Sequence, residues 1–274
     1  MALALTLAFG TGPEWLGPQP AAGAPRRIVS LAPSLTEILF ALGVGPRVVA
    51  VTRFDHEPAA VNSLPRVGGF VDPDPEAVLA TRPDLVVAAP VAGSRGRLDA
   101  LARLQVSVLV IPAETLDELW QAIEILGRVC GVERPAAALR ERMQAELAAV
   151  AAATTRTAPL RVLLVVGYRP LIIAGAASFL GGVLSLVNAR NALASAQPFA
   201  QIDLEAVWAA APDVIVDLTM GESAPEGFWR PVLENSKAPP RLLTIKDEAL
   251  LRPGPRLGSG LRGLAAALRP AGTP

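Results

Sequence analysis

The acidic residues with the most regular spacing are Glu76 and Glu205, which occupy equal places in a stretch of sequence that occurs twice. Residues 70–87 and 199–216 share identical residues at positions 129 apart (199 − 70 = 129). An offset this large, far beyond the period of a solenoid, predicts two lobes built on one plan. A carboxylate at the start of the equivalent helix in each lobe could form charge-assisted hydrogen bonds with arginines. It could equally well complement the positive end of its own helix dipole.

Residues suited to catalysis are scarce. The chain has no G-x-S-x-G, H-E-x-x-H or Gly-rich phosphate-binding motif. His56 is the only histidine, which excludes a site that needs two, and Cys130 is the only cysteine, which excludes an internal disulfide. We expect Cys130 to pack in the core at the end of an apolar helix. A two-lobed α/β enzyme that acts through His56 stays open as an alternative, although nothing marks a partner serine.

The composition limits the class of protein. Among 274 residues, 25 Lys and Arg balance 25 Asp and Glu, so the formal net charge is +0. This balance disfavours nucleic-acid binding, which needs clustered Lys and Arg. Hydrophobic residues make up 51% and the mean hydropathy is +0.41. No apolar run reaches the roughly 18 residues of a membrane-spanning helix, so we expect a soluble mature protein.

Residues 1–25 differ in composition from the rest of the chain. Ala2 to Phe9 is a short apolar run, and a Pro/Gly/Ala stretch ends in small residues before Arg26, the first basic residue. The segment is interpreted as an atypical export signal, with a disordered tail as the alternative. A lipid anchor is not expected, because Cys130 lies far downstream.

Strand and helix patterns alternate on both sides of a central helical stretch. Ser34 and Glu37 have the spacing of a capping box, which predicts a helix that begins at Ser34 and ends at Gly43. Alternation of this kind is typical of α/β lobes with parallel strands. The predicted strands are 27–31, 48–52, 85–88, 106–111, 161–166, 171–174, 214–218 and 241–245. The predicted helices are 34–43, 75–81, 98–104, 115–130, 178–187, 204–211 and 257–268.

Residues 135–153 predict one long helix, since strong helix formers dominate and apolar residues recur at helical spacing. Its place between two similar halves suggests a rigid connection rather than a flexible hinge. The predicted organisation is therefore an N-terminal α/β lobe over 26–133, a linker helix over 134–157 and a C-terminal α/β lobe over 158–274.

Three groups of motifs point to a known family. They are Ser30-Leu31-Ala32-Pro33-Ser34-Leu35-Thr36-Glu37, then Val67-Gly68-Gly69-Phe70 with Pro75-Glu76 and Arg82-Pro83-Asp84-Leu85-Val86, and finally Arg252-Pro253-Gly254-Pro255-Arg256. In order and spacing they resemble the periplasmic binding proteins of ABC importers for iron chelates, haem and vitamin B12. The resemblance covers about residues 26–269 and is greatest to the vitamin B12-binding members. It implies a class III fold, in which two Rossmann-like lobes are joined by one long helix.

The resemblance also implies which residues serve which role. In the family the ligand lies between the lobes, and one exposed glutamate of each lobe docks into arginine pockets of the permease; the matching residues here are Glu76 and Glu205. The matching ligand-binding positions are Ala32, Pro33, Ser34, Phe54, His56, Glu57, Phe70, Gly167, Tyr168, Asp247 and Arg252. Phe199 is a further candidate among the few aromatic residues. For Asp247 and Arg252 a loop ion pair is the alternative.

Cobalamin or another corrinoid is the first ligand expected from the resemblance, and haem or a ferric siderophore is the alternative. His56 is either a solvated loop histidine or an axial ligand to haem iron or corrinoid cobalt; Tyr168 is a weaker candidate for haem iron. No cofactor, no catalysis and no protein-only metal site are expected. The expected partners are an ABC permease and its ATPase, the expected state is a monomer, and the expected location is the periplasm.

Overall fold

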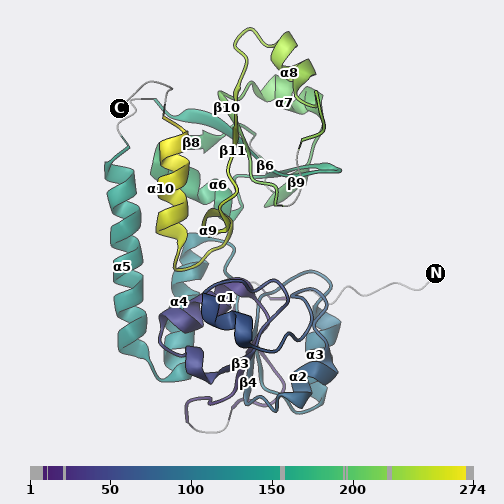
Figure 1. The fold of residues 1–274 in the computed structure, drawn as a ribbon, viewed down its shortest axis with the longest axis vertical. Helices are drawn as coiled ribbons and strands as arrows, with labels where there is room; N and C mark the ends of the chain where they lie inside the picture. Colours follow the sequence, from purple (N-terminus) through teal and green to yellow (C-terminus); the bar gives the residue numbers. More distant parts are fainter. Residues whose placement is uncertain are drawn as a thin grey trace, which may run out of the picture. The chain divides into compact units, whose positions relative to one another are not determined.

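The computed structural model describes residues 9–10, 12–20, 23–154, 158–193, 195, 197–220 and 224–269, which form two compact units. Unit 1 comprises Met1–Ala113 and Asp117–Glu141, and unit 2 comprises Glu114–Leu116 and Arg142–Pro274. Each unit has a β-sheet and flanking helices, as Figure 1 shows for each unit by itself. The predicted α/β class with two lobes is therefore confirmed.

Unit 1 is built on a five-stranded sheet in the order β1-β5-β4-β2-β3, in which only β1 is antiparallel to its neighbour. Because the other four strands are parallel, their carboxyl ends meet at one edge of the sheet. The strands are β1 (Glu14–Leu16), β2 (Ile28–Ser30), β3 (Val48–Ala50), β4 (Leu85–Ala88) and β5 (Val108–Val110). The helices are α1 (Pro33–Ala41), α2 (Pro75–Ala80), α3 (Arg95–Arg103), α4 (Leu116–Cys130) and the 3₁₀ turns Gly45–Arg47 and Ala59–Ser63.

Unit 2 has a sheet in the order β11-β10-β6-β7-β9, with β8 also paired with β6. Strands β8, β10 and β11 are parallel to the strand they pair with, whereas β7 and β9 are antiparallel. The strands are β6 (Leu160–Tyr168), β7 (Leu171–Ala174), β8 (Ala189–Asn191), β9 (Phe199–Gln201), β10 (Val214–Asp217) and β11 (Arg241–Thr244). The helices are α6 (Phe179–Leu184), α7 (Leu204–Ala210), α8 (Arg230–Asn235), α9 (Glu248–Leu251), α10 (Leu257–Ala267) and the 3₁₀ turn Ser185–Val187.

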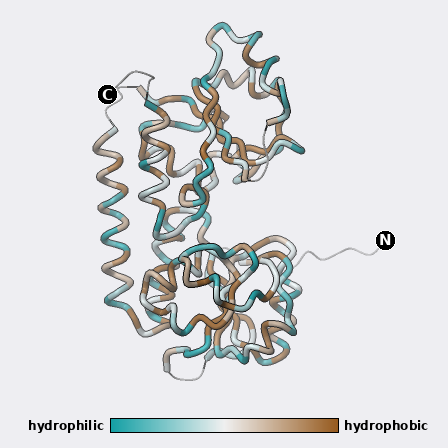
Figure 2. The backbone as a smooth tube through the Cα atoms, in the orientation of Figure 1, coloured by the Kyte–Doolittle hydropathy of each residue, from teal (hydrophilic) through white to brown (hydrophobic). Residues whose placement is uncertain are grey.

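The helix predicted over residues 135–153 is α5 (Glu133–Ala152), and it is continuous from unit 1 into unit 2. Brown and teal alternate along α5 in Figure 2, because its apolar residues recur at helical spacing. Leu139, Met143, Leu147 and Val150 are buried. Its second half packs beside α10, where Gly258 gives room for the side chain of Glu146.

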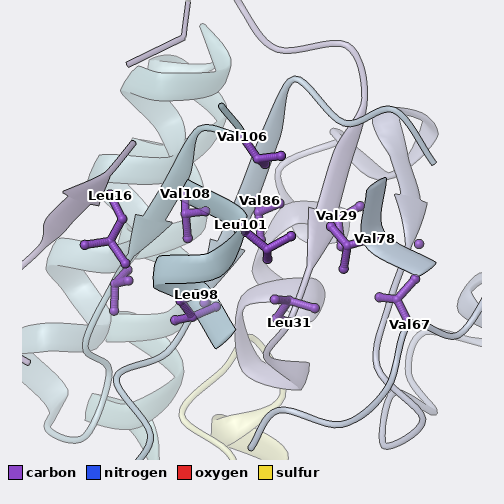
Figure 3. Packing of buried hydrophobic residues seen from close by; sticks show 13 residues of the cluster. Leu16, Val29, Leu31, Val67, Val78, Val86, Leu98, Leu101, Val106 and Val108 are labelled. Carbon is purple, nitrogen blue, oxygen red and sulfur yellow. The ribbon is translucent and has the colours of Figure 1, made fainter. Parts of the chain in front are cut away.

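One hydrophobic cluster of unit 1 lies between its sheet and helices α2 and α3. Figure 3 shows Val29, Val86 and Val108 from three neighbouring strands facing Leu98 and Leu101 of α3. Branched side chains fit the pleated surface of a parallel sheet that is covered by helices. Unit 2 has its own core cluster, in which Leu163, Val165 and Ile215 of the sheet pack with Val207 and Trp229. Each unit therefore has a hydrophobic cluster of its own that packs on its sheet.

The segment 1–25 differs from the expected tail. Glu14–Leu16 is strand β1, paired with β5, Leu16 is buried, and the Arg95 guanidinium lies 2.9 Å from a Glu14 carboxylate oxygen. Phe9 packs against the core, and Arg95 lies over its ring at 5.3 Å. The disordered-tail alternative therefore does not hold for residues 14–16. The apolar run before Phe9, on which the export-signal interpretation depends, lies outside the described residues.

Several local predictions need correction. The helix α1 begins at Pro33 with Ala32 as its N-cap, so Ser34 is not a capping residue, and Glu37 is buried. The helix predicted over 178–187 is α6 followed by a 3₁₀ turn, and α3 begins three residues before the predicted start. Strands β1, β8 and β9 and the short helices α8 and α9 were not predicted. They have three to six residues each, too few to show a period.

Candidate functional site

The loops after β2 and β3 lie at the carboxyl edge of the unit 1 sheet, where α/β proteins commonly bind ligands. After β2 the chain turns directly into α1. Thr36 donates its hydroxyl proton toward Ser30 Oγ at 2.8 Å and the Ala32 carbonyl at 3.2 Å. These buried contacts fix the turn and leave Pro33 and Ser34 partly exposed. Backbone N–H groups at the start of α1 are then available to a polar ligand edge.

The loop after β3 is held by two charged side chains. Asp55 is fully buried and accepts hydrogen bonds from the Thr52 amide at 2.9 Å and the Thr52 hydroxyl at 2.5 Å. Arg66 donates from Nη1 to the carbonyls of Thr52 and Asp55. With Asp55 turned inward, its neighbour His56 is exposed. The exposed position is compatible with both interpretations of His56, a solvated side chain or an axial ligand.

Phe54 and Phe70, predicted from different parts of the sequence, come together. Their ring centroids are 5.1 Å apart, and Phe54 is 38% exposed. The approach is imposed by the backbone, since Arg53 donates its amide to the Gly68 carbonyl and Val67 donates its amide to the Val51 carbonyl. Gly68 has a φ of +94°, and a Cβ there would lie 2.6 Å from the Asp72 carbonyl oxygen, so this turn requires glycine.

Arg53 and Asp72 complete this group, and neither was predicted. The Arg53 guanidinium lies 4.9 Å from the centroid of the Phe54 ring and donates from Nη2 to Asp72 at 2.7 and 3.0 Å. The hydrogen bond from Arg53 holds the pKa of Asp72 below its usual value, so Asp72 is ionised near neutral pH. The signal available in the sequence was the Gly68-Gly69 pair, whose tight turn brings residues 67–72 against the loop after β3.

In unit 2 the predicted positions Gly167 and Tyr168 are not in a loop. Both belong to β6 and pair with β7, at Gly167 with Ile172 and at Tyr168 with Leu171. Tyr168 is 5% exposed and packs edge-on against Phe228 and Trp229, with centroids 5.2 and 6.0 Å apart. Burial raises the pKa of its phenol to about 12. Tyr168 is therefore a core residue of unit 2, which disfavours it as an iron ligand.

Asp247 and Arg252 flank the short helix α9. Asp247 is the N-cap and accepts a hydrogen bond from the Ala249 amide at 2.9 Å. Arg252, just after the helix, pairs with Glu248 at 2.9 Å. This ion pair joins residues four apart, which lie on one face of a helix. Phe199 belongs to strand β9 and is 56% exposed.

Glu76 and Glu205 occupy equivalent places in equivalent helices. Asp74 caps α2 and accepts from the Glu76 and Ala77 amides, and Asp203 caps α7 and accepts from the Ala206 amide. In each case the glutamate is the second residue of the helix and is exposed. Each cap accepts from one or two of the first amides of its helix, and the two glutamate side chains form no ion pair with other described residues.

The repeat extends further than the sequence comparison showed. Arg27 lies directly before β2 and Arg161 is the second residue of β6, and each donates to the end of the repeated helix of its unit, at the carbonyls of Thr81 and Ala210. Their amides donate to Asp84 and Asp213 at 2.7 Å. The two arginines are 134 apart (161 − 27 = 134), because the segments between each arginine and the repeat differ in length, so the offset of 129 did not reveal them.

Metal chemistry finds little support among the described residues. They contain no group of three or more His, Cys, Asp or Glu placed to hold a metal ion. Cys130 is fully buried as expected, and burial raises the pKa of its thiol to about 11. Within the part of the chain that is described, no helix has the length and apolar character needed to cross a membrane.

Comparison with known proteins gives a consistent result. A family model described as periplasmic binding protein matches residues 28–236. An uncharacterised ABC transporter substrate-binding lipoprotein of Bacillus subtilis is 30% identical over 257 residues, 90% of this chain and 81% of the relative. A vitamin B12-binding protein of Pectobacterium atrosepticum is 27% identical over 241 residues, 85% of each chain. The solved periplasmic haem-binding protein RhuT of Roseiflexus sp. RS-1 is 30% identical, with a TM-score of 0.79 over 89% of this chain and 98% of that one.

Proposed function

The chain belongs to the periplasmic binding protein family, and on this premise we propose that it is the substrate-binding protein of an ABC importer, which captures a metal chelate and delivers it to a membrane permease. The observation that carries this proposal is the pair of exposed glutamates at equivalent helix starts in two units of one design. A protein that must meet one membrane partner with both units needs such a pair. No catalytic step is part of the proposal.

Docking is assigned to Glu76 and Glu205. Each lies on a helix whose start is fixed by an aspartate cap and by a fully buried valine, Val78 or Val207. Two carboxylates held in this way can form charge-assisted bonds with arginines of the permease, and such bonds fix orientation as well as adding affinity. The proposal includes export to the periplasm, a monomeric protein and an ATPase that acts through the permease.

The ligand is proposed to be a metal chelate, and cobalamin or another corrinoid is the first candidate, because vitamin B12-binding proteins recur among the relatives. Haem is the second candidate, supported by the haem-binding protein of Roseiflexus at 30% identity, and a ferric siderophore is the third. The proposed contacts in unit 1 are Ala32, Pro33, Ser34, Phe54, His56, Glu57 and Phe70. In unit 2 they are Gly167, Asp247 and Arg252. That the ligand lies between the lobes stays a prediction.

Ligand titrations test the proposal. The purified protein is mixed in turn with cyanocobalamin, haemin and ferric siderophores, and binding is followed by absorbance and calorimetry. Saturable one-to-one binding of one of them is expected. If none of these chelates binds, the ligand proposal fails, while family membership stands on the sequence match. His56→Ala is the matched variant. If it loses the ligand-induced shift in the metal absorbance band, His56 is an axial ligand; if the shift is unchanged, His56 is a solvated side chain.

A further inference from the structure

Arg53 is an exposed arginine whose position is fixed from two directions. Asp72 holds one end of the guanidinium through Nη2, at 2.7 and 3.0 Å, and the Phe54 ring lies against its face at 4.9 Å. Phe54 in turn packs on Phe70 at 5.1 Å. A long side chain that is already ordered loses less conformational entropy when it binds a further group. The arrangement is therefore prepared for a ligand.

Two donor nitrogens of the Arg53 guanidinium are open. Only Nη2 makes hydrogen bonds within the described residues, so the N–H groups of Nε and Nη1 have no partner there. The Arg53 side chain is 49% exposed. These two N–H groups lie on either side of Nη2 in the plane of the guanidinium, and each can donate a charge-assisted hydrogen bond to a carboxylate oxygen. Arg53 can therefore bind a second carboxylate without giving up Asp72.

The surrounding charges allow a second anion. Asp72 alone would repel it, but Arg97 lies near enough to lower the pKa of Asp72 further and donates from Nη1 to the Pro73 carbonyl at 3.3 Å. The guanidinium groups of Arg53 and Arg97 thus give an excess of positive charge beside the single carboxylate of Asp72. Gly69 keeps this pair compact, since a Cβ there would lie 2.4 Å from Asp72 Oδ1 and 2.9 Å from Arg53 Nη2.

A surface ion pair with no further role is the simpler reading, and such pairs add little stability. That reading does not account for the exposed aromatic surface beside the pair. Phe54 is 38% exposed and Phe70 is partly exposed, at the carboxyl edge of the sheet. A flat apolar surface next to open guanidinium N–H groups matches a planar ring system that carries a carboxylate on its rim.

We infer that Arg53 is a specificity-determining residue, which binds a rim carboxylate of a planar chelate whose face packs on Phe54 and Phe70. The inference rests on the proposed function and names the ligand class within it. Haem carries two propionate carboxylates, whereas the corrin rim of cobalamin carries neutral amides. Arg53 therefore favours haem, the second candidate above, over cobalamin.

The test pairs one protein change with one ligand change. Haemin, haemin dimethyl ester and cyanocobalamin are each titrated into the unchanged protein, Arg53→Gln and Arg53→Lys. Arg53→Gln should weaken haemin binding about ten-fold or more, since a hydrogen bond between charged groups contributes that much to the affinity. It should change binding of the ester less than about two-fold, because the ester has no carboxylate. Arg53→Lys should recover only part of the loss, because lysine lacks the fork.

Arg128→Gln is the control variant, since Arg128 is an exposed arginine in the last turn of α4 and is not among the proposed ligand contacts. It should bind all three ligands as the unchanged protein does, and thermal unfolding checks that every variant is folded. Equal loss for haemin and its ester would overturn the inference, since Arg53 would then only support Phe54. Unchanged haemin binding, or binding of cyanocobalamin but not haemin, would also overturn it and leave the proposed function intact. Failure of every chelate would remove both.

Discussion

Residues 70–87 of unit 1 and 199–216 of unit 2 share a skeleton but present different surfaces. In both, an aspartate caps a short helix and a fully buried valine anchors it. A residue one or two positions after the helix has a left-handed backbone, at Arg82 with φ 48° and at Ala211 with φ 41°. In both, an aspartate then accepts backbone amide hydrogens at the start of a central strand, β2 in unit 1 and β6 in unit 2.

The two stretches differ in the contacts that their other side chains make. Phe70 packs on Phe54, whereas its counterpart Phe199 stands exposed on β9. Leu79 packs against the core of unit 1, whereas its counterpart Trp208 is 54% exposed and donates its indole N–H to the Asn235 carbonyl at 3.0 Å. The repeated positions thus set the frame, and the unrepeated contacts make each unit's surface distinct.

The largest expected effect concerns the two exposed glutamates that the repeat shares. Reversing both charges with Glu76→Lys and Glu205→Lys should reduce chelate uptake to background, because arginines of the permease would face like charges. Binding of the chelate to the isolated protein should not change. Uptake into cells or proteoliposomes, beside a binding titration, measures both. Unchanged uptake with intact ligand binding would remove the docking role, and the helix dipole alone would explain the two carboxylates.

A second prediction separates the units by pH, since unit 1 buries the Cys130 thiol and unit 2 buries the Tyr168 phenol. Each pKa is raised in the folded state, to about 11 from 9.0 and to about 12 from 10.0. The unfolded chain therefore releases these protons first, and stability falls as pH rises, from about 9 in unit 1 and from about 10 in unit 2. For Cys130 the loss approaches about 2 to 3 kcal/mol at the top of its window.

Urea unfolding between pH 8 and 10.5, with hydrogen exchange assigned to each unit, measures this difference. Cys130→Ala should remove the early fall in unit 1 and leave unit 2 unchanged, and Tyr168→Phe should act only on unit 2. A slope in unit 1 that is the same with and without Cys130 would contradict the assignment.

The third prediction compares Asp84 with Asp213. Asp84 accepts from the amides of Arg26 and Arg27 at 2.8 and 2.7 Å, whereas Asp213 accepts from the amide of Arg161. Asp84→Ala should cost unit 1 about 2 kcal/mol and Asp213→Ala should cost unit 2 about 1 kcal/mol, because one more backbone donor loses its acceptor in unit 1. Denaturant unfolding of each variant measures the two losses. A larger loss for Asp213→Ala than for Asp84→Ala would contradict this prediction.

The smallest expected effect is at the helix caps. Asp74→Ala and Asp203→Ala should each destabilise by about 1 kcal/mol, the usual value for an N-cap carboxylate. Asp74→Asn and Asp203→Asn serve as controls and should recover most of the loss, since asparagine caps almost as well. Thermal unfolding of the four variants is sufficient. If the alanine variants lost no stability, the caps would not be what orients Glu76 and Glu205.

Much of the fold could be predicted from patterns longer than one turn. The long helix α5 and the amphipathic α4 have clear periods, and the buried strands β4 and β10 are β-branched runs that follow a Pro-Asp pair. Elements of three to six residues, such as β1, β9 and α9, have no such signal, and the two strands are held by pairing with β5 and β7. Strand β1 forms because β5 offers it an edge.

The candidate site was predicted only in part, for a related reason. Phe54 and Phe70 were recognisable as aromatic residues beside glycines, but their contact depends on backbone bonds between residues 51–53 and 67–68. Arg53 and Asp72 looked like ordinary surface charges until the turn at Gly68 brought them together. Tyr168 was placed in a loop because the strand pattern weakens at Gly167, yet pairing with β7 extends β6 through it.

The sequence by itself determined the α/β class, the two-lobed plan, the connecting helix and the place of the repeated acids. Each of these follows from local periodicity or from identity at a fixed offset. Neither of these two signals depends on contacts between distant residues. Only the tertiary structure decided that Asp55 turns inward while His56 faces solvent, that Tyr168 is a core residue, and that Arg53 lies on Phe54 with two donor nitrogens open. These outcomes depend on contacts between residues far apart in the chain, whose geometry is set by the packing of the whole unit.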